Sequence, residues 1–146
     1  MVKESHLGEI TLRKYERPYE SSKRELVKKV CLSLGLLQPG DSRDIMVDIM
    51  LVLEDARKKR EWLSSFQIRD KVEAVRKEHS LEVKGLAESN IRRQLKRLRD
   101  AMIIDKQENQ YRMSEFEPLK EIFESKIEKF LIPQIIERIK EYLGKL

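Results

Sequence analysis

The stretch from Ser89 to Asp100 holds the densest group of side chains able to recognise a ligand through hydrogen bonds and positive charge. Its polar and basic members include Ser89, Asn90, Arg92, Arg93, Lys96 and Arg97. Arginine can pair with guanine and asparagine with adenine, whereas serine and lysine can reach either bases or phosphates. These residue types therefore favour contact with a polyanion that also presents base edges.

The spacing of apolar residues in this stretch predicts the helix that would position them. Ile91, Leu95 and Leu98 are separated by four and three residues, so they share one face of a helix over about residues 87–102. With that face packed inward, the other can enter the major groove of B-DNA, which is about 12 Å wide and admits one helix. We expect Ser89, Asn90, Arg93 and Lys96 on the groove side, and phosphate contacts from Arg92, Arg97, Lys106 and Arg112.

Positive charge is concentrated around this predicted helix. The whole chain has 31 basic and 26 acidic residues, which gives a net charge of +5. Residues 87–112 contain seven basic and four acidic residues, so they supply +3 of that surplus. This surplus of positive charge lies where contact with a nucleic acid would need it. The alternative interpretation is a basic helix face that contacts only water.

The sequence lacks the patterns of catalytic and metal sites. One cysteine and two histidines allow neither an internal disulfide nor a zinc site of recognised spacing. There is no glycine-rich phosphate loop and no Ser/His/Asp set. We therefore expect no enzyme activity, no metal and no cofactor, and we interpret Cys31 as a small core residue.

Hydropathy indicates no membrane segment. No apolar run approaches the roughly 18 residues of a membrane span. The first residues also lack the apolar core of a signal peptide. The sequence therefore predicts a cytoplasmic protein without a membrane partner.

Capping residues predict where the other helices begin. The candidates are Ser22 with Glu25, Asp41, Ser64 with Gln67, and Ser114 with Glu117. The helix after Asp41 is apolar on nearly every side, which predicts a central, buried position. Met46 and Met50 in this helix are expected in the core, although regulatory proteins can use such positions to line an effector pocket.

Two short strands are expected after the basic helix, at residues 103–107 and 110–114 around Glu108 and Asn109. The order of helix, short helix, basic helix and hairpin is the winged-helix arrangement. The segment Ser89–Ile104 resembles the recognition helix and following strand of winged helix-turn-helix regulators, and Leu63–Arg69 resembles the helix that precedes it. Met102 stands where those regulators often have glycine.

The layout of the whole chain is similar to that of MarR-type regulators, in which terminal helices that dimerise flank a winged helix. The resemblance implies a mainly α fold with a small β-hairpin, namely a winged helix-turn-helix flanked by N- and C-terminal helices. It divides the chain into an N-terminal arm at 1–20, a winged-helix DNA-binding domain with its preceding helix at 21–114, and a C-terminal dimerisation helix at 115–146.

The final helix is expected to run to about Leu143, with a kink at Pro133 because proline cannot donate to the carbonyl of Lys129. Its apolar residues recur every four positions, and such a row drifts about 40° per step. The helix would therefore contact its own domain first and a partner chain after Pro133. The expected homodimer interface consists of Leu131, Ile135, Ile136, Ile139 and Leu143; complete folding back onto its own domain is the alternative.

These observations lead to two expectations about function. The first is a sequence-specific transcriptional regulator that binds double-stranded DNA as a homodimer, with the helix at 87–102 in the major groove. The alternative is a winged-helix subunit that binds other proteins within a transcription or replication assembly, since a fold does not determine a function.

Overall fold

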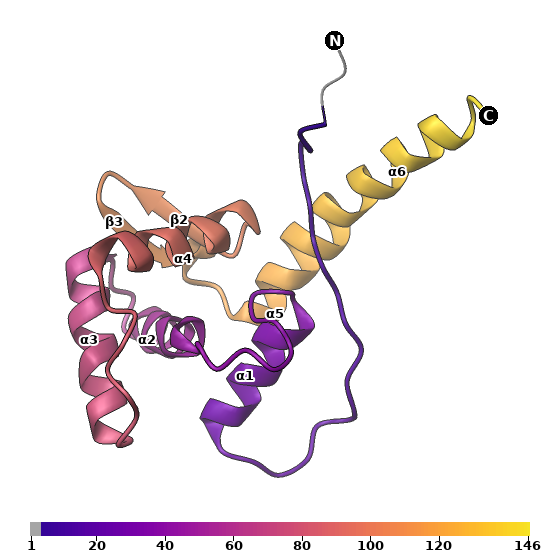
Figure 1. The fold of residues 1–146 in the computed structure, drawn as a ribbon. Helices are drawn as coiled ribbons and strands as arrows, with labels where there is room; N and C mark the ends of the chain where they lie inside the picture. The colour runs from indigo at the N-terminus through magenta and orange to yellow at the C-terminus, as the bar shows by residue number, and fades with distance from the viewer. Residues whose placement is uncertain (1–3) are drawn as a thin grey trace.

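The computed structural model describes residues 4–146, which form a mainly helical protein with a small antiparallel sheet (Figure 1). The helices are α1 (Lys23–Ser33), α2 (Ile45–Lys58), α3 (Ser65–Glu78), α4 (Glu88–Asp100), α5 (Leu119–Ile122) and α6 (Ile132–Leu143). The strands are β1 (Leu63–Ser64), β2 (Ile104–Gln107) and β3 (Gln110–Met113). The expectation of a mainly α fold with a small β element is confirmed at this level.

Helix α2 forms the centre of the core, as its apolar sequence predicts. It contacts α1, α3 and β3. Val47, Ile49 and Leu53 have no exposed surface. Because neighbours cover every residue from Ile45 to Met50, a continuous apolar run is stable in the first turns of this helix.

The sheet has one strand more than the expected hairpin. Strands β2 and β3 pair across Glu108 and Asn109, as predicted, and Ile104 lies opposite Met113. Strand β1 adds to the other edge of β3, which gives the order β1-β3-β2. The prediction missed β1 because it is only two residues long and pairs with residues almost fifty positions away.

Two of the four expected helix caps are correct. The Ser22 side chain accepts a hydrogen bond from the Glu25 amide at 3.2 Å. Ser64 and Gln67 form a full capping box at the start of α3. In each case a local side chain satisfies an amide that the helix leaves without a partner.

The other two expected caps are wrong. Asp41 accepts from the Arg43 amide in a turn, at 2.9 Å, and α2 begins only at Ile45. Ser114 begins a short 3₁₀ turn, and the next helix begins at Leu119 after Pro118. Proline at the helix start is tolerated because the amide it lacks would have no helical partner.

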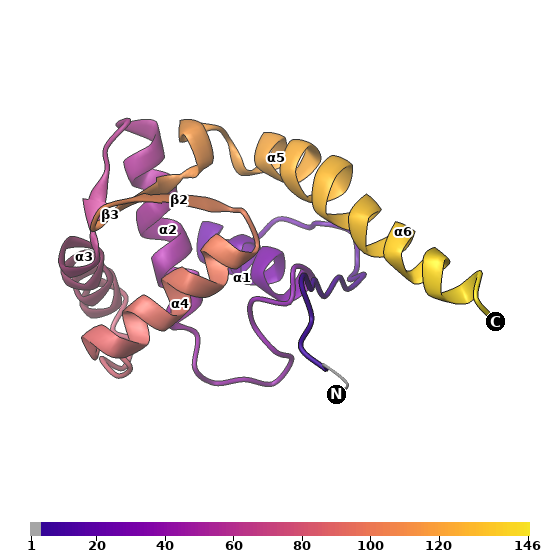
Figure 2. The ribbon, with the colours of Figure 1, turned by 90° about the horizontal axis from the view of Figure 1, so that it is seen from above.

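The C-terminal helix continues through Pro133 and extends away from the rest of the protein (Figure 2). The expected kink is absent, and residues Phe123–Leu131 form a π-helix instead. The Ile132 amide donates to the carbonyl of Ile127, five residues earlier. The wider π turn gives room for the proline ring, which would clash with a carbonyl in a regular α-helix.

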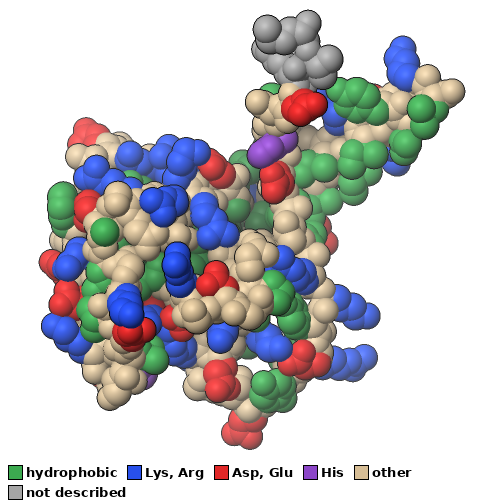
Figure 3. Space-filling model, viewed as in Figure 1, with side chains coloured by type: hydrophobic (Ala, Val, Ile, Leu, Met, Phe, Trp, Pro, Cys, Tyr) green, Lys and Arg blue, Asp and Glu red, His purple; other side chains and the backbone are tan. Residues whose placement is uncertain are grey.

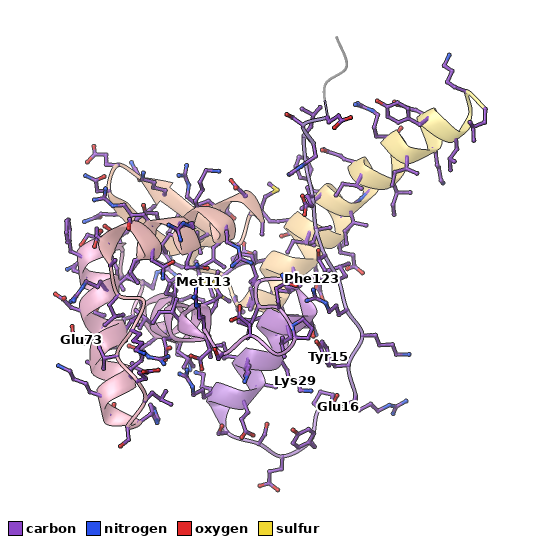
Figure 4. All side chains as sticks on the ribbon, viewed as in Figure 1. Tyr15, Glu16, Lys29, Glu73, Met113 and Phe123 are labelled. Carbon is purple, nitrogen blue, oxygen red and sulfur yellow. The ribbon has the colours of Figure 1, made fainter. Side chains whose placement is uncertain are left out.

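The segment before α1 contains neither helix nor strand from residue 4 to residue 22. Lys29 of α1 holds it through an ion pair with Glu16 at 2.6 Å, and the Lys29 amine lies 4.6 Å from the centre of the Tyr15 ring (Figure 4). Arg13 donates to the carbonyl of Leu32 at 3.0 Å. Residues 1–3 of the predicted arm lie outside the described residues.

Among residues 4–146, no helix combines the length and the apolar composition that crossing a bilayer requires.

The buried thiol of Cys31 is expected to be inert in the folded protein. Burial raises its pKa from 9.0 to about 12, against the opposing effect of the Arg97 charge. At pH 8 the reactive thiolate is then about 1,000-fold scarcer than in the unfolded chain. A thiol-reactive disulfide whose product is coloured should label the native protein far more slowly than the denatured one, and rapid labelling at pH 8 would contradict the burial of Cys31.

Ser80, two residues after the end of α3, adopts a strained conformation that glycine would relieve. Its φ is +54°, and the Leu81 amide donates back to the Arg76 carbonyl at 2.8 Å, a geometry that favours glycine. Relief of about 1–2 kcal/mol of left-handed strain exceeds the entropic cost of glycine, so Ser80→Gly should stabilise the protein by about 0.5–1 kcal/mol. Thermal unfolding should show a higher Tm, whereas Ser21→Gly, at an exposed residue without a positive φ, should not raise it.

Candidate nucleic-acid interface

Helix α4 packs with one face and exposes the other. Ile91, Leu95 and Leu98 are completely buried, as predicted, and the helix contacts α3 and β2. At 100° per residue, the opposite face is centred on Ser89, Arg93, Lys96 and Asp100, all of which are exposed. The sequence thus predicts both the position and the orientation of this helix.

The outer face of α4 is accessible to a large partner. Arg93 makes only a long contact with Asn90, at 3.4 Å, and Lys96 pairs with Asp100 at 3.0 Å on the surface. Exposed ion pairs of this kind are weak and exchange readily. Lys and Arg side chains gather over α4, while α6 points elsewhere (Figures 1 and 3).

Arg92 and Arg99 lie on the flank of α4 that faces α3 and the sheet. Arg92 pairs with Glu88 at 3.2 Å, and its guanidinium lies 5.8 Å from the centre of the Phe66 ring. Arg99 is exposed and lines a shallow depression together with Lys106 of the hairpin. Arg99 is not among the predicted contacts, although its position two turns after Arg92, on the same flank of the helix, could have indicated it.

Asn90 and Arg97, on the opposite flank, are engaged by the protein itself. The Asn90 amide donates to the carbonyl of Gly85 at 2.8 Å and so fixes the connection before α4. Arg97 donates to Gln94 at 2.9 Å and to the carbonyl of Gly35 at 3.3 Å. Contact of either residue with DNA would require these bonds to be exchanged.

The two basic residues of the hairpin also differ in how strongly the protein's own side chains engage them. Arg112 pairs with Asp105 at 3.0 Å and lies between Trp62 and Phe116, with guanidinium-to-ring distances of 4.4 and 4.7 Å. Lys106 is exposed. Its amine lies 5.7 Å from the centre of the Tyr111 ring but pairs with no carboxylate of residues 4–146, so Lys106 is the hairpin cation that can reach a phosphate without breaking an ion pair.

A buried charge cluster beneath this region escaped the sequence analysis. The Asp48 carboxylate has no exposed surface; it pairs with Arg24 of α1 and, at 2.6 Å, with Arg76 of α3. Both arginines also pair with Asp44, at 2.9 and 3.0 Å. The cluster thus ties α1 and α3 to α2; α4 packs against α3, and β3 packs against α2.

Asp44 shows the electrostatic effect of this cluster. Partial burial alone would raise its pKa, but hydrogen bonds from Arg24 and Arg76 outweigh that effect and hold the pKa below 3.8. Asp44 is therefore charged at neutral pH and neutralised within the cluster.

The described part of the chain contains no cluster of three or more His, Cys, Asp or Glu side chains suited to a metal ion. Comparison of the chain with protein-family models, curated proteins and solved structures yields no match.

Proposed function

We propose that the protein is a winged helix-turn-helix regulator that binds double-stranded DNA in a sequence-specific manner through α4. The accessible face of α4 is the observation that carries this proposal. Its inner side is completely buried at Ile91, Leu95 and Leu98, whereas Arg93 and Lys96 project from the other side without strong internal partners. The order α2, β1, α3, α4, β2, β3 supports a winged-helix interpretation.

The internal contacts refine the roles proposed for each residue. Ser89, Arg93 and Lys96 are the best candidates for the major groove, because they lie on the outermost face. Arg92, Arg99 and Lys106 flank that face on the side of the sheet and suit phosphate contacts. Asn90, Arg97 and Arg112 contribute mainly by holding the surrounding loops and aromatic rings.

A binding selection tests this proposal. The full chain is incubated with a library of random duplexes, and the retained sequences are determined. We expect enrichment of a defined site whose affinity falls steeply as salt rises, because each neutralised phosphate releases counterions. Absence of enrichment, or an affinity that salt does not change, would contradict the proposal.

We further propose that α6 joins two copies of the chain. Its apolar side chains remain uncovered: Ile136, Ile139 and Leu143 are each about half exposed. A protruding apolar face of this kind favours association, and a two-fold dimer is the commonest closed form. Two copies of α4 about 34 Å apart would then favour palindromic sites.

Disruption of that apolar face should yield monomers. Ile136→Glu combined with Ile139→Glu places two charges in the proposed interface, so the mass measured by light scattering should fall from that of two chains to that of one. Glu137→Gln, at an exposed neighbouring position, serves as the control and should leave the mass unchanged. A wild-type protein that is already monomeric at micromolar concentration would contradict the dimer.

The same exposed face supports a second candidate function, that of a subunit within a heteromeric assembly. In that case a different protein would cover α6, and the α4 surface would not bind DNA. A stable heteromeric partner recovered with the protein, together with no enriched duplex, would favour this alternative.

A further inference from the structure

A cavity of about 710 Å³ lies beside α4, on the flank away from the sheet. The connection between α1 and α2 forms one wall, the connection between α3 and α4 forms another, and α4 itself forms the third. Sites for small molecules are typically concavities of about 300–1,000 Å³. The cavity therefore has the volume for an organic molecule and is too large for a single bare ion to fill.

The walls of this cavity combine an apolar surface with positive charge. Leu36, Leu37, Ile45 and Met46 supply the apolar part. Five basic and three acidic residues line it, so cations are in excess by two. An apolar surface with a few converging charged groups is typical of sites that bind amphipathic small molecules.

The cations of the cavity divide into those paired with carboxylates and those without a carboxylate partner, although Arg97 in the second group also donates to Gln94 and to the Gly35 carbonyl. Arg76 is buried in the charge cluster with Asp44 and Asp48, and Lys84 pairs with Glu82 at 2.7 Å. Arg43, Arg93 and Arg97, by contrast, form no ion pair with any carboxylate of residues 4–146. Three guanidinium groups thus share one cavity without a charged partner.

Among anions, guanidinium groups bind carboxylates and phosphates particularly well. Their planar set of donors matches carboxylate and phosphate oxygens, with which they form paired, charge-assisted hydrogen bonds. We propose that the cavity binds a small organic anion whose carboxylate or phosphate head is held by Arg43, Arg93 and Arg97, and whose apolar body lies against Ile45 and Met46. This proposal does not depend on DNA binding.

A set of matched ligands tests separately whether the anionic head group and the apolar body of the bound molecule contribute to binding. The ¹⁵N-labelled full chain is titrated with phenylacetate, phenyl phosphate, phenylacetamide, acetate and inorganic phosphate while its amide resonances are followed. We expect at least one of the two aromatic anions to shift the amides of Leu37, Ile45 and Gln94, and to bind at least 10-fold more tightly than the neutral amide or its own bare head group. The tighter of the two aromatic anions identifies the head group.

A charge variant tests the assignment of the arginines. Arg43 is exposed and its side chain makes no hydrogen bond to residues 4–146, so Arg43→Ala should fold normally and weaken anion binding at least 5-fold. Lys14→Ala removes the same charge from a residue outside the cavity and should leave binding unchanged. The proposal would be overturned if phenylacetamide, acetate or inorganic phosphate bound as tightly as the aromatic anions. It would also be overturned if the shifts were confined to other surfaces, or if Arg43→Ala left anion binding unchanged.

Discussion

Replacement of Asp48 by alanine is expected to lower the free energy of unfolding by about 3–5 kcal/mol, the largest effect of any single substitution considered for this protein. The Asp48 carboxylate is completely buried between Arg24 and Arg76, and the latter is itself buried. Without Asp48, two guanidinium groups would share only the partly exposed Asp44. Urea unfolding monitored by circular dichroism measures the loss directly.

The same helix offers a matched control. Asp55 pairs with Lys59 at 3.1 Å, but both side chains are more than half exposed. Asp55→Ala should therefore cost less than about 1 kcal/mol. Similar losses for the two variants would show that the buried cluster contributes no more than a surface ion pair does.

The second large effect concerns the outer face of α4. Arg93→Ala combined with Lys96→Ala should weaken binding to a selected duplex about 100-fold at moderate salt, because each lost contact with a base edge costs about 1–3 kcal/mol. The slope of log affinity against log salt should also become shallower, because two positive charges leave the interface. Fluorescence anisotropy at several salt concentrations measures both quantities.

A double variant with the same charge change provides the comparison. Lys14→Ala combined with Lys28→Ala removes two exposed positive charges from the N-terminal segment and α1. This control should reduce affinity only slightly, through the lower net charge. If both double variants bind equally well, or if the α4 variant is unaffected, α4 is not the DNA-binding element.

Features governed by neighbouring residues could be predicted from the sequence. Ser64 and Gln67 satisfy each other's amides within one helical turn, so the start of α3 follows from four residues. The inner face of α4 likewise follows from the spacing of Ile91, Leu95 and Leu98. The hairpin also follows from its short apolar strands although its turn lacks glycine, because Glu108 adopts the positive φ of +57° that the turn requires.

Features that depend on distant residues could not be predicted in this way. In the sequence, Asp48 is a single polar residue in an apolar helix, and its partners Arg24 and Arg76 lie 24 and 28 positions away. Asp41 fails as a cap because its carboxylate is used within its own turn. Arg97 looks like a surface cation, yet it reaches the Gly35 carbonyl 62 positions away. Such pairings are decided by tertiary packing, which periodicity does not report.

Arg93 occupies two surfaces at once, because it lies on the outer face of α4 and also lines the adjacent cavity. An anion bound in the cavity would neutralise the Arg93 charge and hold its side chain toward the cavity, away from a base edge in the groove. A molecule seated in the cavity and a duplex lying on α4 would therefore antagonise each other. Thermodynamic reciprocity then requires each to weaken the other's affinity by the same factor, so a metabolite could release the protein from DNA without any change of fold.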